Sequence, residues 1–146
     1  MDKKIDEQNF QQKYMQYNLY KQQAQGLLKE ISLLNQTMQN LTIAQEVLTN
    51  LNGAKKDSEI LVPVGGNTFV KAKIADEKNV LSGVGADVIL KKPIPEALKT
   101  ITEQLENLKK TGEELGTKMK EIEDNMRDLE PEIQKMMMQA QKEHKH

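Results

Sequence analysis

The chain has 146 residues and a net charge of −1; 29% of its residues are charged, 3% are aromatic and none is Trp. This composition excludes a compact globule built around a large aromatic core. The absence of Cys excludes disulfide scaffolds, thiolate zinc sites and cysteine nucleophiles, and a single Arg among 21 basic residues argues against nucleic acid as a partner.

Membrane and enzyme classes are also disfavoured. No apolar run approaches the roughly 20 residues that span a bilayer, and the polar start of the chain lacks the apolar stretch of a secretory signal. No nucleophile, metal-ligand set or cofactor loop stands out. We therefore expect a soluble, intracellular protein that has no membrane partner, metal, cofactor or enzymatic activity.

Residues 1–52 favour a helix, because they hold a single Gly, no Pro and many Gln. Steps of alternately 3 and 4 residues trace a stripe that is apolar at ten of 12 positions. The stripe consists of Phe10, Lys13, Tyr17, Tyr20, Ala24, Leu27, Ile31, Leu34, Met38, Leu41, Gln45 and Leu48. This spacing predicts a coiled-coil helix.

Residues 53–95 hold five of the 8 Gly and three of the 4 Pro, and they concentrate Val, Ile, Thr and Phe. Short β-favouring runs between turn residues predict four strands in two hairpins. The runs are ILVPV (60–64), TFVKAKI (68–74), NVLSGV (79–84) and DVILKK (87–92). The glycine pairs between them lack the spacing of a dinucleotide loop or the Lys of a phosphate loop, so we interpret them as hairpin turns.

Residues 96–146 predict a second coiled-coil helix, which begins after Pro95, a residue suited to a first helical turn. Its stripe is apolar at 12 of 13 positions: Leu98, Ile101, Leu105, Leu108, Gly112, Leu115, Met119, Ile122, Met126, Leu129, Ile133, Met136 and Ala140. A straight helix drifts about 20° per heptad from such a stripe, so a closed seam requires left-handed supercoiling.

Folding the chain back through residues 53–95 makes the two stripes antiparallel, with facing residue numbers that add to 146. Leu34 then faces Gly112, which pairs a large residue with a small one. A shift by one heptad would also align the stripes, so a shifted register remains an alternative to this one. Gly112 and Gly116 are interpreted either as close-packing positions or as a soft point for bending.

Four short strands with unpaired edges cannot form an independent core. In TFVKAKI, alternation places Val70, Ala72 and Ile74 on one face, so at least this face is built for burial. We infer that the strands pair with copies of themselves or with a related subunit. The residues expected to form this contact are Leu61, Val62, Val64, Phe69, Val70, Ile74, Val80, Leu81, Val88, Ile89 and Leu90.

The middle segment also carries the motifs of a known family. LVPVGGNTFVKAKI (61–74) looks like that family's first strand, turn and F-x-K-A strand, and VLSGVGADVILKK (80–92) looks like its second hairpin. DLEPEIQKM (128–136) looks like the proline-containing stretch near its C-terminal tip. The chain thus resembles the prefoldin alpha subunit of archaeal type, the alpha class of the GIM complex.

The resemblance implies a hexamer of two alpha and four beta subunits, whose strands form a β-barrel body with projecting coiled coils. The fold expected is α+β, a long antiparallel two-helix coiled coil with two β-hairpins at its closed end that join this body. The resemblance further implies a cytoplasmic, ATP-independent chaperone that binds unfolded client proteins and delivers them to a group II chaperonin in the cytosol. Two hairpins favour the alpha class, because the beta class carries one.

Client binding requires apolar side chains that stay exposed, and the far ends of the helices supply candidates. Three successive Met residues spread over roughly 200° of a helix, so a two-helix seam cannot cover all of them. Met is also adaptable enough to contact many sequences. The expected client-binding residues are Phe10, Tyr14, Met15, Tyr17, Ile133, Met136, Met137 and Met138.

One alternative concerns the role of these residues, and another concerns the function of the chain. Phe10 and Met136 can simply close the seam, with Met137 and Met138 as ordinary surface residues. We expect instead that the charge of Lys13 and the lost hydrogen bond at Pro131 loosen the last turns and splay the tips. The alternative to a chaperone is a structural, tethering or filament-forming prefoldin-like protein.

Overall fold

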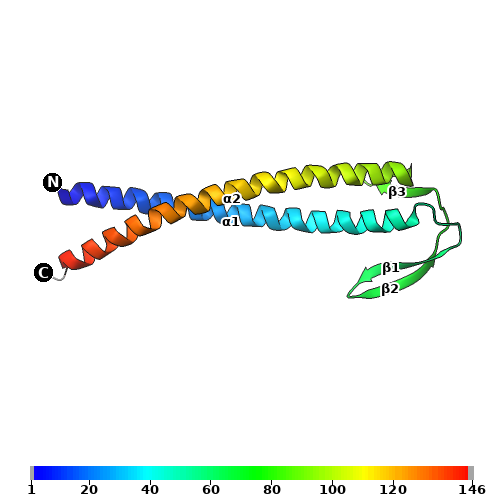
Figure 1. Cartoon of the computed structure of the whole chain (residues 1–146), viewed down its shortest axis with the longest axis horizontal. Helices are drawn as coiled ribbons and strands as arrows, with labels where there is room; N and C mark the ends of the chain where they lie inside the picture. The colour runs from blue at the N-terminus through cyan, green and yellow to red at the C-terminus, as the bar shows by residue number, and fades with distance from the viewer. Residues whose placement is uncertain (1, 145–146) are drawn as a thin grey trace. The chain divides into compact units, whose positions relative to one another are not determined.

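The computed structural model describes residues 2–144, with side chains described for residues 7–142. In chain order its elements are helix α1 (Asp2–Leu51), strands β1 (Glu59–Gly65), β2 (Thr68–Lys73), β3 (Asn79–Gly83) and β4 (Ile89–Pro93), and helix α2 (Ile94–His144) (Figure 1). The prediction of two long helices with two β-hairpins is confirmed. The described chain divides into two compact units: unit 1 holds residues up to Asn35 and from Lys109 onward, and unit 2 holds Gln36–Leu108.

In unit 1, α1 and α2 pack antiparallel in the register that the heptads predict. A Cβ built on Gly112 would lie 3.4 Å from Leu34 Cδ2, so these two residues face each other. A shift by one heptad would instead place Leu34 opposite Leu105 or Met119. The observed contact with Gly112 therefore excludes a shifted register in this unit. Gly112 is therefore a packing position, whereas a Cβ on Gly116 would meet nothing within 4 Å.

Burial along both helices follows the predicted stripes. All 12 stripe positions of α1 are partly shielded from solvent, and 12 of the 13 on α2 are partly shielded or buried, Ala140 being the exposed exception. The most buried stripe residues of unit 1 are Leu115, Met119 and Ile133. Nearly all other helix positions are exposed, so each helix buries a narrow apolar stripe rather than a broad face.

The end of α1 and the start of α2 lie in unit 2. Gly53 adopts a φ of +88° just after α1, a conformation that Gly reaches without a steric penalty and that commonly ends a helix. Helix α2 begins at Ile94, two residues before the predicted boundary, and the Ile94 N–H, which has no partner within the helix, donates to the carbonyl oxygen of Lys78 at 3.0 Å. Pro95 follows in the first turn, where no N–H is needed.

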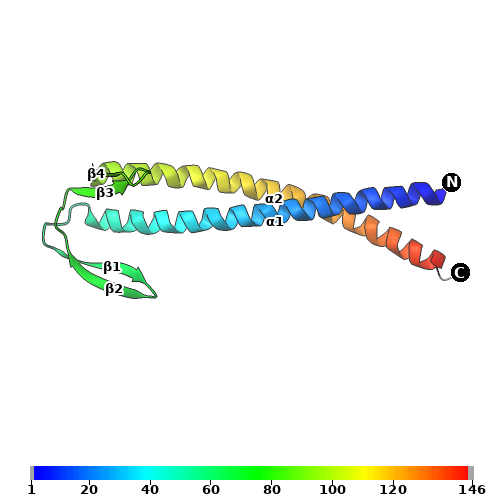
Figure 2. The same ribbon diagram turned by 180° about the vertical axis from the view of Figure 1, so that it is seen from behind.

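The four strands form two separate antiparallel hairpins, β1 with β2 and β3 with β4 (Figure 2). In the first hairpin, Val62 pairs with Val70 and the register shifts between Pro63 and Gly65. Its turn is Gly66 and Asn67, both with a φ of +57°, as a two-residue type I′ turn requires. The second turn places Ala86 and Asp87 at φ +50° and +60°, and the Val88 N–H donates to the Gly85 carbonyl oxygen at 3.0 Å.

Unit 2 has only a small core of its own. Ile74, Ile94 and Ala97 are its buried apolar residues. Backbone hydrogen bonds fix this junction: the Ile74 N–H donates to Ser58 O at 3.0 Å, and the Asp57 N–H donates to Ile74 O at 2.8 Å. The strands themselves are mostly outside this core.

Candidate binding surfaces

The ends of the two helices in unit 1 expose an apolar surface, the tip surface, which consists of Phe10, Tyr14, Met15, Tyr17, Met136, Met137 and Met138. Four of these side chains lie off the seam and are open to solvent: Met138 is 69% exposed, Met15 67%, Met137 49% and Tyr14 47%. The other three belong to the seam and are half-buried. The Met triplet is exposed for the predicted reason, because only one of three successive helical residues can enter the seam.

Aromatic side chains of the tip surface are ordered by helical spacing. The rings of Phe10 and Tyr14 stack with centroids 5.9 Å apart and an interplanar angle of 17°. These residues are four apart on α1, so their side chains lie on one side of the helix. The half-buried ring of Phe10 therefore lies against the exposed ring of Tyr14. Together the two rings form an aromatic face that runs from the seam to the exposed side of α1.

Ile133 differs from the other residues expected to bind clients. It is 7% exposed and lies in the closed seam. Helix α2 runs through Pro131 without a break and continues to His144. The expected contact of Ile133 with clients therefore requires the helices to separate around it.

The charge of Lys13 was expected to loosen the seam, but the structure shows this charge paired with a carboxylate. Its Nζ donates to Glu132 Oε2 at 2.7 Å, and this ion pair joins α1 to α2 beside Ile133. The long aliphatic stem of Lys lets the charge leave the apolar seam and reach a carboxylate at its edge. The two helices diverge toward the ends that carry the termini (Figures 1 and 2). This ion pair and the burial of Ile133 close the seam at this level, and splaying of the last turns stays a prediction.

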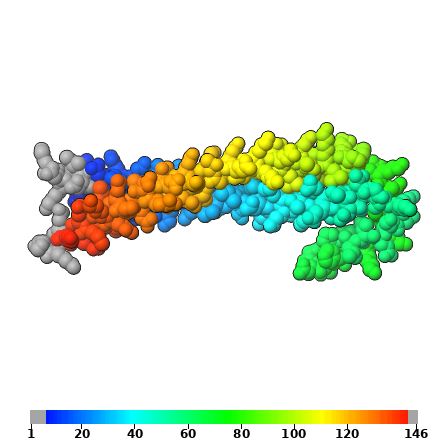
Figure 3. All heavy atoms as spheres, viewed as in Figure 1, coloured from blue at the N-terminus to red at the C-terminus, as the bar shows by residue number. Residues whose placement is uncertain are grey.

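The hairpins of unit 2 expose a second apolar surface, the hairpin surface, formed by Leu61, Val62, Val64, Phe69, Val70, Leu81, Val88, Ile89 and Leu90. Leu81 is 74% exposed and Ile89 63%. Figure 3 shows the β1–β2 hairpin at the surface of unit 2. Every strand also has an unpaired edge, because each sheet contains two strands. Exposed apolar faces and free edges together favour pairing with another chain.

Two residues expected on the hairpin surface lie elsewhere. Ile74 is 6% exposed and belongs to the small core of unit 2, because its backbone is bonded to residues just before β1. Val80 is half-buried. Alternation along TFVKAKI gives the face of Ile74 correctly, but it carries no information on whether that face is covered by the same chain.

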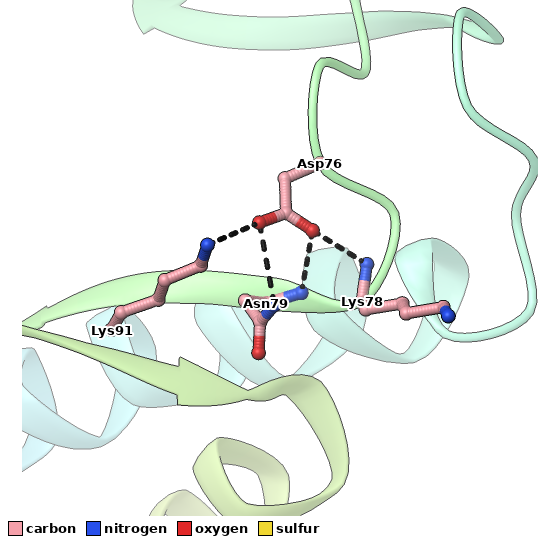
Figure 4. A network of polar contacts seen from close by, with 4 residues as sticks. All are labelled: Asp76, Lys78, Asn79 and Lys91. Atoms are coloured by element: carbon pink, nitrogen blue, oxygen red, sulfur yellow. Dashed lines mark hydrogen bonds and ion pairs between the residues drawn. The ribbon is translucent and has the colours of Figure 1, made fainter.

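Asp76 fixes the start of the second hairpin (Figure 4). Its Oδ1 accepts hydrogen bonds from the backbone N–H groups of Lys78 at 3.0 Å and Asn79 at 3.1 Å. Its Oδ2 accepts from Asn79 Nδ2 at 3.3 Å and lies 3.4 Å from Lys91 Nζ on β4. These contacts, the Lys78 N–H foremost, lower the pKa of Asp76 from 3.8 to about 2. One carboxylate thereby holds β3 in position beside β4.

Sequence reasoning missed the apolar residues of α1 that lie off the stripe. In unit 1, Leu19, Leu28 and Leu33 are 55%, 58% and 65% exposed. Their signal is present in the sequence, since they are Leu residues outside the 3 and 4 spacing. Single exposed apolar side chains are common on soluble surfaces, so these positions serve below as controls matched in exposure to the tip surface.

Other kinds of site are not found in the described part of the chain. Among these residues, no three His, Asp or Glu side chains come together as they would around a metal ion. Neither helix, over its described length, has a stretch apolar enough to cross a membrane.

Comparison with known proteins gives a consistent family. The family model described as Prefoldin subunit matches residues 20–139. The chain is similar to prefoldin subunit alpha of Methanococcus aeolicus, with 36% identity over 91 residues that cover 62% of this chain and 61% of the relative. It is similar to prefoldin subunit alpha 1 of Thermococcus kodakarensis, with 33% identity over 89 residues that cover 61% of each chain. The matches thus span about 61% of the length of these relatives.

Solved structures support the same fold. A chain of filamentous PFD from Methanocaldococcus jannaschii matches with a TM-score of 0.61 and 28% identity, over 79% of this chain and 95% of that chain. The prefoldin beta subunit from Thermococcus strain KS-1 matches with a TM-score of 0.60 over 87% of this chain and 90% of that chain, and its 16% identity shows the fold alone. The resemblance seen in the hairpin motifs is confirmed: the chain belongs to the prefoldin subunit family.

Proposed function

We propose that the chain is a subunit of a molecular chaperone that binds non-native polypeptides without ATP and delivers them to a group II chaperonin in the cytoplasm. The observation that carries this proposal is the tip surface, where Met and Tyr side chains stay open to solvent at the ends of a closed helix pair. The names of the similar proteins, prefoldin alpha subunits, support it.

The chemistry of the tip surface suits clients without a fixed sequence. Met side chains are flexible and polarisable, so one surface adapts to many apolar segments. Tyr14 adds an apolar ring with a polar hydroxyl, which contacts both apolar and polar parts of an unfolded chain. Binding of this kind needs no bond making, so we assign the chain no catalytic residue, metal or cofactor.

The hairpin surface supports an assembly in which the strands of several subunits share one body. We infer that the partners are beta-type prefoldin subunits, in a hexamer of two alpha and four beta chains. Exposed strands such as β1, with apolar residues on both faces, gain burial and backbone hydrogen bonds in such a body. The assembly would hold several tip surfaces together, and several weak contacts with one client strengthen binding.

A structural or filament-forming protein is the alternative. One similar structure is titled filamentous PFD, but the names of the relatives, alpha subunits of prefoldin, favour the chaperone. The mass of the purified chain, measured with and without a beta-type partner, separates the two. A closed complex of six chains supports the proposal, whereas an open series of larger masses supports a filament.

An aggregation assay tests the proposed function directly. The full chain, assembled with a beta-type partner, is mixed with a denatured client, and light scattering follows aggregation. We expect suppression by the native chain and loss of suppression when Phe10, Tyr17, Met136, Met137 and Met138 are all replaced by Ser.

Three of those five residues lie in the seam, so a second variant separates binding from folding. It replaces only exposed residues, Tyr14→Ser, Met15→Ser, Met137→Ser and Met138→Ser, and the matched control carries Leu28→Ser and Leu33→Ser. Suppression that falls in the tip variant and persists in the control supports the proposal. Equal suppression by the native chain and both tip variants would contradict it.

A further inference from the structure

The Met residues fall into two groups that differ sharply in exposure. Met15, Met137 and Met138 lie on the tip surface and are 67%, 49% and 69% exposed. The other four whose side chains are described belong to the helix seam: Met119 is 9% exposed, Met38 and Met126 are half-buried, and so is Met136, the seam Met of the tip surface. An aqueous reagent therefore meets the tip thioethers before it meets those of the seam.

The tip thioethers also lack the usual competitors for an oxidant. The chain contains no Cys, the side chain that peroxides oxidise most readily, and no Trp. A hydroperoxide that reaches this chain thus finds exposed Met sulfur as its most reactive target. The absence of thiols and the exposure of three sulfurs are independent features that point to the same chemistry.

We propose that Met15, Met137 and Met138 are sites of reversible oxidation by hydroperoxides, and that their oxidation weakens binding of non-native clients. In each step the sulfur gives two electrons to the peroxide as the O–O bond breaks. One peroxide oxygen becomes the sulfoxide oxygen, and the other leaves as water or as an alcohol. This inference rests on the proposed function, because it assigns a modification to the same tip surface.

The physical effect follows from the change in polarity. A sulfoxide turns a flexible apolar side chain into a polar one that prefers water to an apolar client segment. Since the three residues are already exposed, oxidation there disturbs no packing between α1 and α2. The seam Met residues are shielded, so the helix pair keeps its register while the tip surface loses its apolar character. Reduction by a dithiol-dependent methionine sulfoxide reductase reverses the change.

The test oxidises the full chain, assembled with its beta-type partner, by graded hydrogen peroxide. Peptide mass spectrometry then gives the oxidation rate of each Met, and light scattering gives the amount of complex needed for half-suppression of client aggregation. We expect the three tip Met residues to oxidise faster than Met119, and the amount required to rise by about tenfold.

Two variants locate the effect. The first carries Met15→Leu, Met137→Leu and Met138→Leu, which keeps the size and apolarity of the side chains but removes the reactive sulfur. The second carries Met38→Leu and Met126→Leu in the seam. Each protein is compared with itself before and after peroxide. We expect the tip variant with Leu at positions 15, 137 and 138 to keep its suppression of aggregation after peroxide. The seam variant should lose suppression as the native chain does.

The outcomes separate this inference from the function on which it rests. Loss of suppression in the oxidised native chain but not in the tip variant, with recovery after enzymatic reduction, supports the inference. If unoxidised protein suppresses aggregation and peroxide leaves it unchanged, or affects the tip variant equally, the inference is wrong and the proposed function stands. If unoxidised protein never suppresses aggregation, the proposed function fails and the inference fails with it.

Discussion

Asp76 illustrates how a single side chain positions a surface of this protein. Three N–H donors and the ammonium of Lys91 converge on its carboxylate, and they stabilise the charged form relative to the unfolded chain. The pKa is accordingly lowered from 3.8 to about 2. A lowered folded-state pKa means that the stabilisation is complete above the unfolded pKa and is lost as the pH falls through the folded one.

We expect Asp76→Asn to weaken the second hairpin at neutral pH, because the amide carries no charge and offers one acceptor in place of two. The native chain should lose this stabilisation between about pH 4 and pH 2, and the variant should not. Chemical unfolding at pH 6 and at pH 2 measures the difference. Glu77→Gln is the control, since Glu77 takes no part in the network of Figure 4; an equal pH dependence in the native chain and the Asp76→Asn variant would contradict this account.

Substitutions at two glycines of α2 should change the free energy of unfolding in opposite directions. Gly116→Ala should raise the free energy of unfolding by about 0.5–1 kcal/mol, since Ala favours helix and a Cβ there meets nothing within 4 Å. Gly112→Met should lower it by about 1–3 kcal/mol, because its side chain must displace Leu34. Thermal unfolding followed by circular dichroism distinguishes them, and equal shifts for both variants would show that Gly112 is not a packing position.

At the scale of elements, heptad spacing predicts the helix contacts closely. The facing of Leu34 and Gly112 follows from counting steps of 3 and 4 along two stripes, because supercoiled helices keep that period for their whole contact. Spacing could not predict the Lys13 to Glu132 ion pair, since Glu132 lies beside the stripe and only side-chain reach decides whether the charges meet. The burial of Ile133 follows from the same closed seam.

The hairpins were less predictable than the helices. Alternation and turn residues predict four strands, but not the irregular register between Pro63 and Gly65. The conformation of the second turn could not be predicted either, because Ala86 and Asp87 adopt positive φ although neither residue is Gly or Asn. The flanking strands hold this turn in place despite the conformational energy of positive φ at two residues other than Gly. The sequence alone does not predict this strain.

This strain predicts a stabilising change. Ala86→Asn combined with Asp87→Gly supplies the pair that type I′ turns favour, and should stabilise the second hairpin by about 1 kcal/mol. Gly66→Ala, at φ +57° in the other turn, should destabilise by a similar amount, about 1 kcal/mol. Unfolding midpoints in urea measure both changes. A lower midpoint for the first variant would show that the strands do not strain the turn.

At the scale of the whole molecule, the chain buries little of its apolar surface by itself. Among the described side chains, the buried apolar residues are Ile74, Ile94, Ala97, Leu115, Met119 and Ile133. Most apolar residues of the strands stay exposed, as do those of the tip surface. The shortage of aromatic residues in the sequence is thus matched by small cores, and the two exposed surfaces take different roles in the proposed account.

Charge placed on the hairpin surface should prevent assembly without unfolding the chain. Leu81→Lys with Ile89→Lys alters two residues that are 74% and 63% exposed, so the helices should keep their circular dichroism. Burying the new charges against a beta-type partner would be costly, so native mass spectrometry should show loss of the complex. Leu28→Lys is the control on α1, and a complex of unchanged mass with the Leu81 and Ile89 variant would contradict the assigned role.

The central claim, that the tip surface binds non-native chains, is tested most directly by site-specific photo-cross-linking. A photoreactive amino acid replaces Met138 in one protein and Leu28 in another, at positions 69% and 58% exposed, and each assembled protein is irradiated with an unfolded client. The account predicts cross-links to the unfolded client from position 138, few from position 28, and few from either to the same client in its native state. Equal cross-linking from both positions, or none from position 138, would contradict it.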